Sequence, residues 1–412
     1  MGEIYTSLEL GSDSIKIIVT QKMKNRFLTL ATACIESRGI KNGLITDTKS
    51  AVFSVKKALK QVNDELGVKI TRAIVCVAPF VCKMRIFPGV WDVIDYEQIT
   101  GEDVRGVLKD ALNGRINDAE EVVTVVPIDF KVDDNEGIKD PKDMAGKVLE
   151  TKVVVATLPK EPLYRILEVV KLSGIDTVDI AFTSTGDYYT AKEKDYDKLV
   201  GAVINIGKTS TNVAVFNRGI QIKNSMIMMG SKDIDNNLCD YFKIDSLKAR
   251  ALKETFAVAT AAYADVNDIY ETSNLNNTPI EINQVEASKI VEEGLRKILK
   301  LSKNEIKNLT NREISYIILT GGLSEVLGFQ YLVDEMFGPV AKICNINSMG
   351  IRHNKYSSAY GIIKYFDEKL ALRGRACDMM SKEDKKILTT KEQKNISNDS
   401  IINKVFGHFF DN

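Results

Sequence analysis

Two glycine turns, each set between strand-forming stretches, lie far apart in the sequence and look like copies of one unit. The first turn, at Gly11, separates the apolar stretch Ile4–Leu10 from residues 15–20, and the second, at Gly207, lies between similar stretches. Apolar runs joined by glycine and small polar residues are typical of β-hairpins. The two glycines are 196 residues apart (207 − 11). A duplication of this kind predicts two lobes with a ligand between them.

Length and composition limit the class of protein. A chain of 412 residues with 44% hydrophobic content predicts at least two cores, because single cores seldom grow beyond about 250–300 residues. The chain has 56 basic and 56 acidic residues. This balance argues against nucleic-acid binding, because proteins that bind nucleic acids usually have an excess or a surface stripe of basic residues. The six cysteines lack metal-ligand spacing and are expected to be buried thiols of a cytosolic protein. With only His353 and His408, no Ser/His/Asp or Cys/His centre is expected, and His353 is interpreted as a loop residue.

The amino terminus shows no signal-peptide pattern, and no apolar run reaches the roughly 18 residues of a membrane span. The body of the protein is therefore expected in the cytoplasm. Apolar periodicity predicts an α/β chain that becomes mainly helical after residue 219, with an Asn-rich surface loop at residues 272–278. Apolar periodicity predicts helices at Thr48–Leu66 and at residues 159–172, 234–241, 246–256 and 284–302. A further helix is predicted to start at Thr100, which can form a capping box with Asp103.

The C-terminal tail has its own pattern. Residues 381–395 are rich in Lys, Glu, Gln and Asn without an apolar face, which predicts a flexible linker. Apolar residues then return on one side of a predicted short helix, at Ile401, Ile402, Val405, Phe406, Phe409 and Phe410. Such a helix is marginal alone in water, so it is expected to lie in a membrane interface or to dock on the protein or a partner. The linker favours the membrane.

The glycine turns also suit phosphate binding, because glycine lets backbone N–H groups approach phosphate oxygens closely. A third turn, Gly321-Gly322, follows a buried-strand pattern and can form the floor under a purine. The order and spacing of the three turns resemble those of the actin, Hsp70 and sugar-kinase superfamily.

Within that superfamily the chain resembles the FtsA family, the actin-like membrane tether of the bacterial cell-division ring, over nearly its whole length. The most specific motif is residues 136–146, Glu-Gly-Ile-Lys-Asp-Pro-Lys-Asp-Met-Ala-Gly, which is similar to the loop of the FtsA-type inserted subdomain. The tail matches the family's membrane-targeting helix. Further similar stretches are residues 11–16, 37–43, 319–322 and 355–361.

The resemblance implies an α/β, two-lobed actin-like fold of duplicated ribonuclease-H-like type, with an inserted FtsA-type subdomain and a C-terminal amphipathic helix. It also implies where the parts begin and end. They are the first-lobe core (1–82), the inserted subdomain (83–161), the first-lobe return with a connecting helix (162–198), the second-lobe core (199–227), its helical upper subdomain (228–305), its return with the adenosine motif and a second connecting helix (306–371), a flexible linker (372–397) and the membrane-targeting helix (398–412).

The resemblance further implies an ATP site. Its phosphate-binding residues would be Gly11, Ser12, Asp13, Ser14, Lys16, Gly207, Lys208, Thr209 and Ser210, and its adenosine-binding residues Gly230, Lys253, Gly321 and Gly322. The chain departs from the family at the carboxylates that hold Mg²⁺ beside the phosphates. Glu9 and Asn205 stand where the family usually has Asp, and Lys208 adds a positive charge. Nucleotide binding without efficient hydrolysis is therefore expected, with little need for Mg²⁺. Two alternatives stay open: turns that only maintain the fold, and true ATPase activity.

The implied function is a scaffold that polymerises head to tail, binds the C-terminal peptide of FtsZ and attaches to the cytoplasmic side of the membrane at the division site. The peptide site is expected on the upper subdomain, with Arg296 and Lys297 as candidate contacts. Two alternatives share the superfamily: an actin-like platform of another envelope machine such as a pilus, and a small-molecule kinase. A kinase would need a catalytic Asp or Glu near the acceptor hydroxyl, and kinase activity would not explain the apolar helix predicted in the tail.

Overall fold

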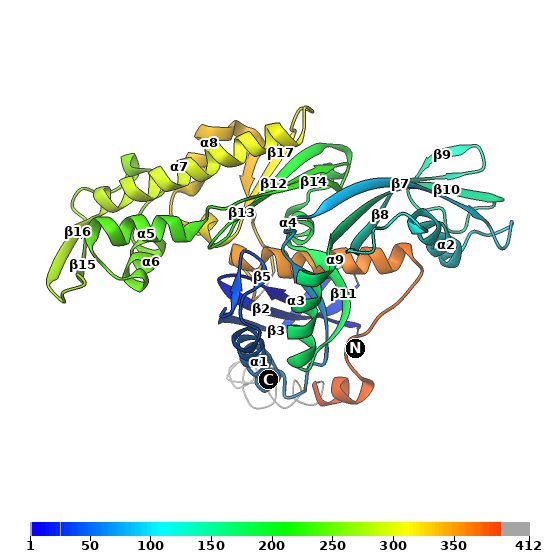
Figure 1. Cartoon of the computed structure of the whole chain (residues 1–412), viewed down its shortest axis with the longest axis horizontal. Helices are drawn as coiled ribbons and strands as arrows, with labels where there is room; N and C mark the ends of the chain where they lie inside the picture. Colours follow the sequence, from blue (N-terminus) through cyan, green and yellow to red (C-terminus); the bar gives the residue numbers. More distant parts are fainter. Residues whose placement is uncertain (1, 25, 349, 389–412) are drawn as a thin grey trace, which may run out of the picture.

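The computed structural model describes residues 2–24, 26–348 and 350–388, which form two lobes and a smaller subdomain at one side (Figure 1). Each lobe is built on a five-stranded sheet. In the first lobe the strand order is β11 (Asp176–Phe182), β6 (Arg72–Val77), β1 (Ile4–Leu10), β2 (Ser14–Met23), β3 (Arg26–Glu36). In the second lobe it is β18 (Ala341–Ile343), β17 (Tyr316–Thr320), β12 (Val200–Ile206), β13 (Thr211–Asn217), β14 (Ile220–Ile227).

The two sheets have the same topology, which confirms the duplication predicted from the glycine turns. In each lobe three consecutive strands form antiparallel pairs, and two later strands add in parallel beside the first. The turns occupy equivalent positions in the first hairpin. The N–H of Gly11 donates to the Ser14 carbonyl oxygen at 3.2 Å, and the N–H of Gly207 donates to that of Ser210 at 3.0 Å.

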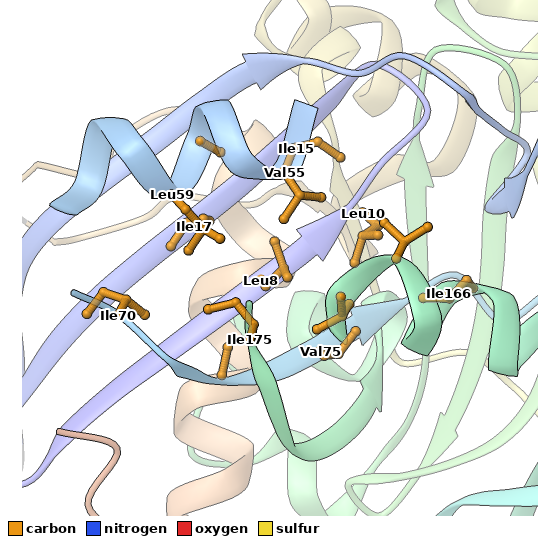
Figure 2. Close-up of a cluster of buried hydrophobic side chains, with 14 of the residues drawn as sticks. Leu8, Leu10, Ile15, Ile17, Val55, Leu59, Ile70, Val75, Ile166 and Ile175 are labelled. Atoms are coloured by element: carbon orange, nitrogen blue, oxygen red, sulfur yellow. The ribbon is translucent and has the colours of Figure 1, made fainter. Parts of the chain in front are cut away.

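The outer face of the first sheet is covered by α1 (Thr48–Leu66) and α3 (Lys160–Leu172) (Figures 1 and 2). Helix α1 has the predicted bounds. Asp47 caps its first turn, and Gly67 ends it at a φ of 76°, which a side chain would disfavour. Val55 and Leu59 lie one turn apart and face Ile17 of the sheet, so burial of this apolar stripe stabilises the lobe.

The two lobes are joined through a helix pair, α4 (Thr183–Ala191) and α9 (Ser357–Leu372). Side chains from both sheets, among them Ile18 and Val203, share one apolar cluster with Ile362 of α9. The helices cross at very close range: a Cβ on Gly361 would lie 1.7 Å from the carbonyl oxygen of Gly186. Glycine is therefore required at this crossing, where the lobes meet behind the cleft.

The inserted subdomain is a four-stranded sheet with one helix against it. The strand order is β7 (Lys83–Asp92), β10 (Val148–Pro159), β8 (Glu120–Val132), β9 (Asn135–Ile138), and the helix is α2 (Gly101–Leu112). The predicted capping box is confirmed: the Thr100 N–H donates to the Asp103 carboxylate at 2.8 Å. The polar loop that follows β8 contains the short strand β9, which sequence did not indicate.

The upper part of the second lobe is mainly helical. It contains α5 (Ser231–Phe242), α6 (Ser246–Thr255), α7 (Gln284–Leu309), α8 (Phe329–Phe337) and a hairpin of β15 (Ile269–Ser273) with β16 (Pro279–Asn283). Of the segment predicted as a loop, residues 272–278, the first two belong to β15 and the remaining five form the turn of this hairpin. The remaining short elements are β4 (Ile40–Lys41), β5 (Leu44–Ile45), η1 (Tyr196–Lys198), η2 (Ala261–Tyr263), η3 (Gly322–Glu325), η4 (Gly338–Val340) and η5 (Asn354–Tyr356).

The chain beyond α9 differs from the expected linker. The prediction of a flexible linker over residues 372–397 is wrong up to Leu388, because residues 382–388 form a helix and the Met380 and Leu388 side chains enter the first-lobe core. The Met379 N–H also donates to the Ile4 carbonyl oxygen at 3.0 Å. Met380 and Leu388 are too few to produce an apolar periodicity in the sequence. Their burial depends on a surface formed by segments that are distant in the sequence.

Residues 389–397 of the predicted linker and the predicted helix at 398–412 lie outside the described residues. Among those that are described, no helix combines the length and the apolar character that a membrane crossing requires.

Candidate functional site

A cavity of about 380 Å³ lies between the lobes. All but one of the residues predicted for phosphate, adenosine and metal binding line it, although they come from four separate stretches of sequence. The first turn and the second turn form opposite walls, α6 contributes Lys253, and Gly321-Gly322 follows β17 at the floor. That these residues bind a nucleotide stays a prediction.

Gly230 is the exception, because it does not line the cavity. A Cβ at this position would lie 2.6 Å from the Gly207 carbonyl oxygen and 2.7 Å from that of Lys208. The next two backbone N–H groups, of Ser231 and Lys232, donate to these same two oxygens at 2.9 and 2.8 Å. Gly230 therefore supports the second turn from behind, and its neighbour Ser231 lines the cavity instead.

The three glycine turns are closely packed against neighbouring backbone. A Cβ on Gly11 would lie 2.8 Å from the Ser14 carbonyl oxygen, and one on Gly207 would lie 3.0 Å from that of Ser210. Gly321 has a φ of 96°, and its Cβ would lie 2.3 Å from the Ile206 carbonyl oxygen. A side chain at any of these positions would push the neighbouring backbone away. Glycine therefore lets these backbone segments lie close together.

Acidic side chains already hold several of the cations in this cavity. Lys16 Nζ lies 2.7 Å from Glu9 Oε1, and both side chains are buried. Burial opposes the charge of Lys16, but the Glu9 carboxylate outweighs it and raises the pKa of Lys16. The other Glu9 oxygen has no hydrogen-bond partner. Lys253 is 1% exposed and lies 2.5 Å from Asp235, so its ammonium group is also paired.

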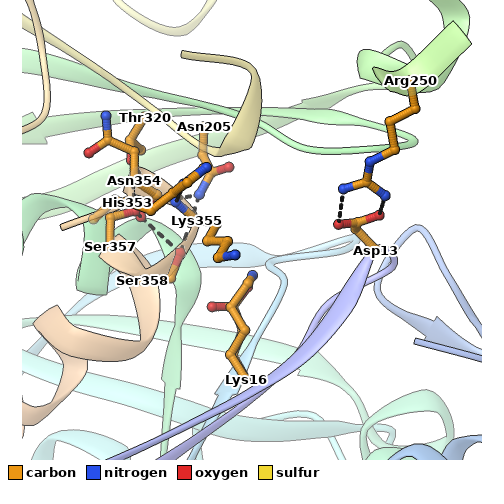
Figure 3. A network of polar contacts seen from close by, with 12 residues as sticks. Asp13, Lys16, Asn205, Arg250, Thr320, His353, Asn354, Lys355, Ser357 and Ser358 are labelled. Atoms are coloured by element: carbon orange, nitrogen blue, oxygen red, sulfur yellow. Dashed lines mark hydrogen bonds and ion pairs between the residues drawn. The ribbon is translucent and has the colours of Figure 1, made fainter. Parts of the chain in front are cut away.

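Asp13 links the two turns. Its carboxylate accepts hydrogen bonds from Arg250 Nη1 at 2.9 Å and Nη2 at 3.2 Å (Figure 3). It also lies 3.2 Å from Lys208 Nζ. Burial works to raise the pKa of Asp13, but Arg250 and Lys208 together lower it. Asp13 is therefore ionised at neutral pH.

Sequence reasoning missed Asp187, a buried carboxylate that contacts two residues of the cavity lining, Asn205 and Ser358. It is fully buried on α4 and accepts hydrogen bonds from Asn205 Nδ2 at 2.6 Å, Ser357 Oγ at 2.5 Å and Ser358 Oγ at 2.8 Å (partners in Figure 3). Burial raises its pKa to about 6 despite these donors. Its only sequence signal was one carboxylate among the small residues of α4.

Because the pKa of Asp187 is raised, the stability of the protein should depend on pH. An aspartate in the unfolded chain has a pKa near 3.9, so the folded state binds more protons between about pH 4 and 6. Asp187 therefore stabilises the folded protein at low pH. As the pH rises through about 6 this contribution is lost, and the free energy of unfolding decreases by on the order of 3 kcal/mol. We expect the free energy of unfolding of Asp187→Asn, measured with urea, to change less with pH than that of the wild type in this range. The exposed Asp134→Asn should keep the wild-type slope, and an unchanged slope in Asp187→Asn would contradict the assignment.

His353 lines the cavity, which its interpretation as a loop residue did not foresee. Its Nδ1 accepts a hydrogen bond from the Lys355 backbone N–H at 3.1 Å. Burial lowers the pKa of His353, so it is neutral at pH 7. The Lys355 side chain points toward that of Lys16 (Figure 3).

The donor set suits a nucleotide better than a metal ion. In the part of the chain that the structure describes, no three His, Cys, Asp or Glu residues come together as a metal site. Glu9 is paired with Lys16, and Asn205 is neutral. A buried hydroxyl without a partner, that of Thr209, borders the second turn and can donate to a phosphate oxygen, whereas the unpartnered Glu9 Oε2 can only accept.

The candidate partner residues lie on α7, away from the cavity. Arg296 donates to Glu292 at 2.7 Å, as its spacing predicts, and to both oxygens of Glu335 at 2.7 Å. Lys297 is exposed. The candidate membrane residues at 401–410 lie outside the described residues.

Two lobes with one duplicated topology, a glycine-walled cavity between them and a connecting helix pair define an actin-like protein. Comparison with known proteins gives the particular family. The family model described as "SHS2 domain inserted in FTSA" matches residues 82–157, and "Cell division protein FtsA" matches residues 202–361. The FtsA of Bacillus subtilis is 27% identical over 376 residues, which cover 90% of this chain and 86% of that protein. The chain belongs to the FtsA family of actin-like cell-division proteins.

Solved structures agree with the fold. The PilM–PilN type IV pilus biogenesis complex matches 88% of this chain and 98% of that chain, with a TM-score of 0.59 and 15% identity. MreB5 of Spiroplasma citri bound to ADP matches 89% and 97%, with a TM-score of 0.56 and 12% identity. A MamK double helical filament matches 88% and 98%, with a TM-score of 0.53 and 11% identity. At these identities the likeness shows the fold alone.

Proposed function

We propose that this protein is the actin-like scaffold that tethers FtsZ filaments to the cytoplasmic face of the membrane during division. The observation that carries the proposal is the match of both the inserted subdomain and the second lobe to FtsA models, together with similarity over 90% of the chain. In this role the protein polymerises, binds the FtsZ C-terminal peptide and attaches to lipid through residues 398–412. Co-sedimentation with FtsZ filaments tests it: a protein that stays in the supernatant at all FtsZ concentrations would contradict it.

The pilus-type platform is the second candidate, since the PilM–PilN structure shares the fold. That likeness rests on 15% identity and therefore supports the architecture only. The matches to FtsA models favour the cell-division role. The kinase alternative gains no support from the carboxylates that line the cavity: Glu9, Asp13 and Glu254 are ion-paired, and Glu325 accepts a hydrogen bond from the Asn354 N–H.

In the same role the cleft binds an adenine nucleotide. We expect its hydrolysis to be slow, because Asn205 and the Glu9–Lys16 pair replace the carboxylates that hold Mg²⁺ in the family. EDTA should change the affinity for ATP less than about threefold, as ammonium groups rather than Mg²⁺ neutralise the phosphates. Gly207→Val should weaken binding at least about tenfold, and Gly207→Ala less, since a Cβ here already meets the Ser210 carbonyl oxygen. Rapid Mg²⁺-dependent hydrolysis that Gly207→Val abolishes would contradict this expectation.

The peptide site is proposed on the upper subdomain, at α6 and α7. An acidic FtsZ peptide should bind more weakly to the variant Arg296→Glu, Lys297→Glu, and its binding should become less sensitive to salt. Lys297→Glu alone separates the effects, because it leaves the contacts of Arg296 with Glu292 and Glu335 intact. The exposed Lys57 on α1 supplies a matched control as Lys57→Glu. An unchanged affinity in a peptide titration of the double variant would place the site elsewhere.

A further inference from the structure

The outer side of α1 carries a line of exposed residues, here called the Phe53 face: Lys49, Phe53, Lys56 and Lys60. These positions follow i, i+4, i+7 and i+11, so the side chains lie above one another along the helix. Phe53 is 62% exposed, although a large apolar side chain gains free energy by leaving water. The opposite side of α1 is buried in the first-lobe core. The helix therefore presents to solvent a basic stripe that contains one aromatic ring.

The positive charge of the Phe53 face is only partly compensated. Lys49 and Lys56, one turn on either side of the ring, make no ion pair with any residue that the structure describes. Lys60 pairs with Asp64, and Asp47 is used to cap the helix. No acidic residue lies between Asp47 and Asp64 in the sequence. In a chain whose basic and acidic residues are equal in number, this is a local excess of positive charge.

The face belongs to the lobe that also holds the end of the described chain. Leu388, the last described residue, is packed in the same apolar core that α1 covers. In Figure 1, α1 and residues 382–388 lie at the same end of the first lobe. Residues 389–397 link Leu388 to the predicted tail helix, with a reach of at most about 30 Å. A membrane that holds the tail therefore lies close to this lobe.

The tail has no excess of positive charge of its own. Residues 398–412 contain Asp399 and Asp411, and their only lysine or arginine is Lys404. A preference of the protein for anionic over neutral lipid therefore has to come from the folded part of the chain.

We propose that the Phe53 face is a second membrane contact, which recognises anionic lipid headgroups. The ammonium groups pair with headgroup phosphates, and the Phe53 ring enters the apolar layer beneath them. The inference rests on the proposed tethering function and adds the lipid class and the side of the first lobe that faces the membrane. One ring and a few cations bind weakly by themselves, so the tail remains the anchor. Once the tail is bound, the face meets the lipid at high effective concentration.

Sedimentation of the full-length protein with vesicles tests the proposal. One kind of vesicle contains phosphatidylcholine alone, and the other contains about 30% phosphatidylglycerol, which supplies negative charge. The wild type should bind the anionic vesicles at least about tenfold more tightly, and salt should reduce this preference. Each lysine near an anionic surface contributes about fivefold, so the variant Lys49→Glu, Lys56→Glu should lose the preference. Its binding to the neutral vesicles should stay within about twofold of the wild type.

The variant Lys300→Glu, Lys307→Glu is the matched control. Both lysines are exposed on α7, in the upper subdomain, and they have the same seven-residue spacing (307 − 300 and 56 − 49). This variant changes the net charge equally and should keep the preference for anionic vesicles. Thermal unfolding reports whether each variant is folded, and Lys49→Gln, Lys56→Gln is a milder second variant if the first is not.

Phe53→Trp reports where the ring lies. The wild type has a single tryptophan, Trp91, in the inserted subdomain. With anionic vesicles, the emission of Phe53→Trp should shift to shorter wavelength and be quenched by brominated lipid chains, whereas wild-type emission should stay the same. Emission of Phe53→Trp that brominated lipid does not quench would mean that the ring stays in water, and would overturn the contact.

The outcomes separate this inference from the tail anchor. A wild type without a preference for anionic vesicles, or a Lys49→Glu, Lys56→Glu variant that keeps it, overturns the inference and leaves the tail anchor intact. If that variant keeps the lipid preference but no longer sediments with FtsZ, the face binds a protein and the inference is wrong. A wild type that binds neither kind of vesicle overturns both proposals.

Discussion

Asn205→Asp is expected to destabilise the protein by about 2–4 kcal/mol at neutral pH. In the wild type the Asn205 amide donates to the buried Asp187 carboxylate at 2.6 Å. An aspartate there removes this donor and places a second carboxylate against the first. Two carboxylates that share one site cannot both ionise without a large cost, so one is forced to hold a proton. The penalty should therefore increase as the pH rises above about 6.

The exchange variant Asp187→Asn, Asn205→Asp gives the control for this prediction. It again has one carboxylate and one amide in contact, so it should recover at least half of the lost free energy of unfolding. Urea unfolding at two pH values measures both effects. Wild-type stability of Asn205→Asp at neutral pH, or an exchange variant as unstable as the single one, would mean that the Asn205–Asp187 contact contributes little.

Phe406→Glu is expected to release the protein from liposomes. Six apolar residues of the predicted tail helix could each contribute roughly 1.5–3 kcal/mol if fully buried. Interfacial burial is partial, however, and ordering the segment costs on the order of 1 kcal/mol per residue. One tail should thus bind weakly. A polymer that presents many tails at high effective concentration should bind strongly, and a charge in the middle of the apolar face should remove that binding.

Vesicle flotation measures this effect, and the structure tells where to shorten the chain. Leu388 is packed in the first-lobe core, so a protein that ends at Asn395 keeps the buried segment and loses only the tail. Between Leu388 and residue 398 there are nine residues (397 − 388), which span at most about 30 Å. We therefore expect the membrane to lie near the first lobe. If Phe406→Glu or the shortened protein floats with vesicles as the wild type does, the tail docks on protein instead.

Much of the fold follows from local sequence. Ile4–Leu10 and Thr48–Leu66 have the predicted bounds, because each combines a clear apolar pattern with turn or cap residues at its ends. The strand β9 and the hairpin of β15 and β16 were not predicted. They are short, polar and held by cross-strand pairing, which no single stretch of sequence records.

The glycines at positions 11, 207 and 321 predict the location of the cleft from sequence, because only glycine tolerates such close backbone contacts. The sequence does not predict which charged side chains of the cleft pair with one another. Asp13 and Arg250 are 237 residues apart, and Asp187 and Ser358 are 171 apart, so nothing local connects them. The sequence determined the duplicated lobes and the family. The tertiary structure brings distant side chains within hydrogen-bond distance and removes water from them, so it alone shows which charges are compensated and that Asp187 is buried against Asn205 and Ser358 of the cavity.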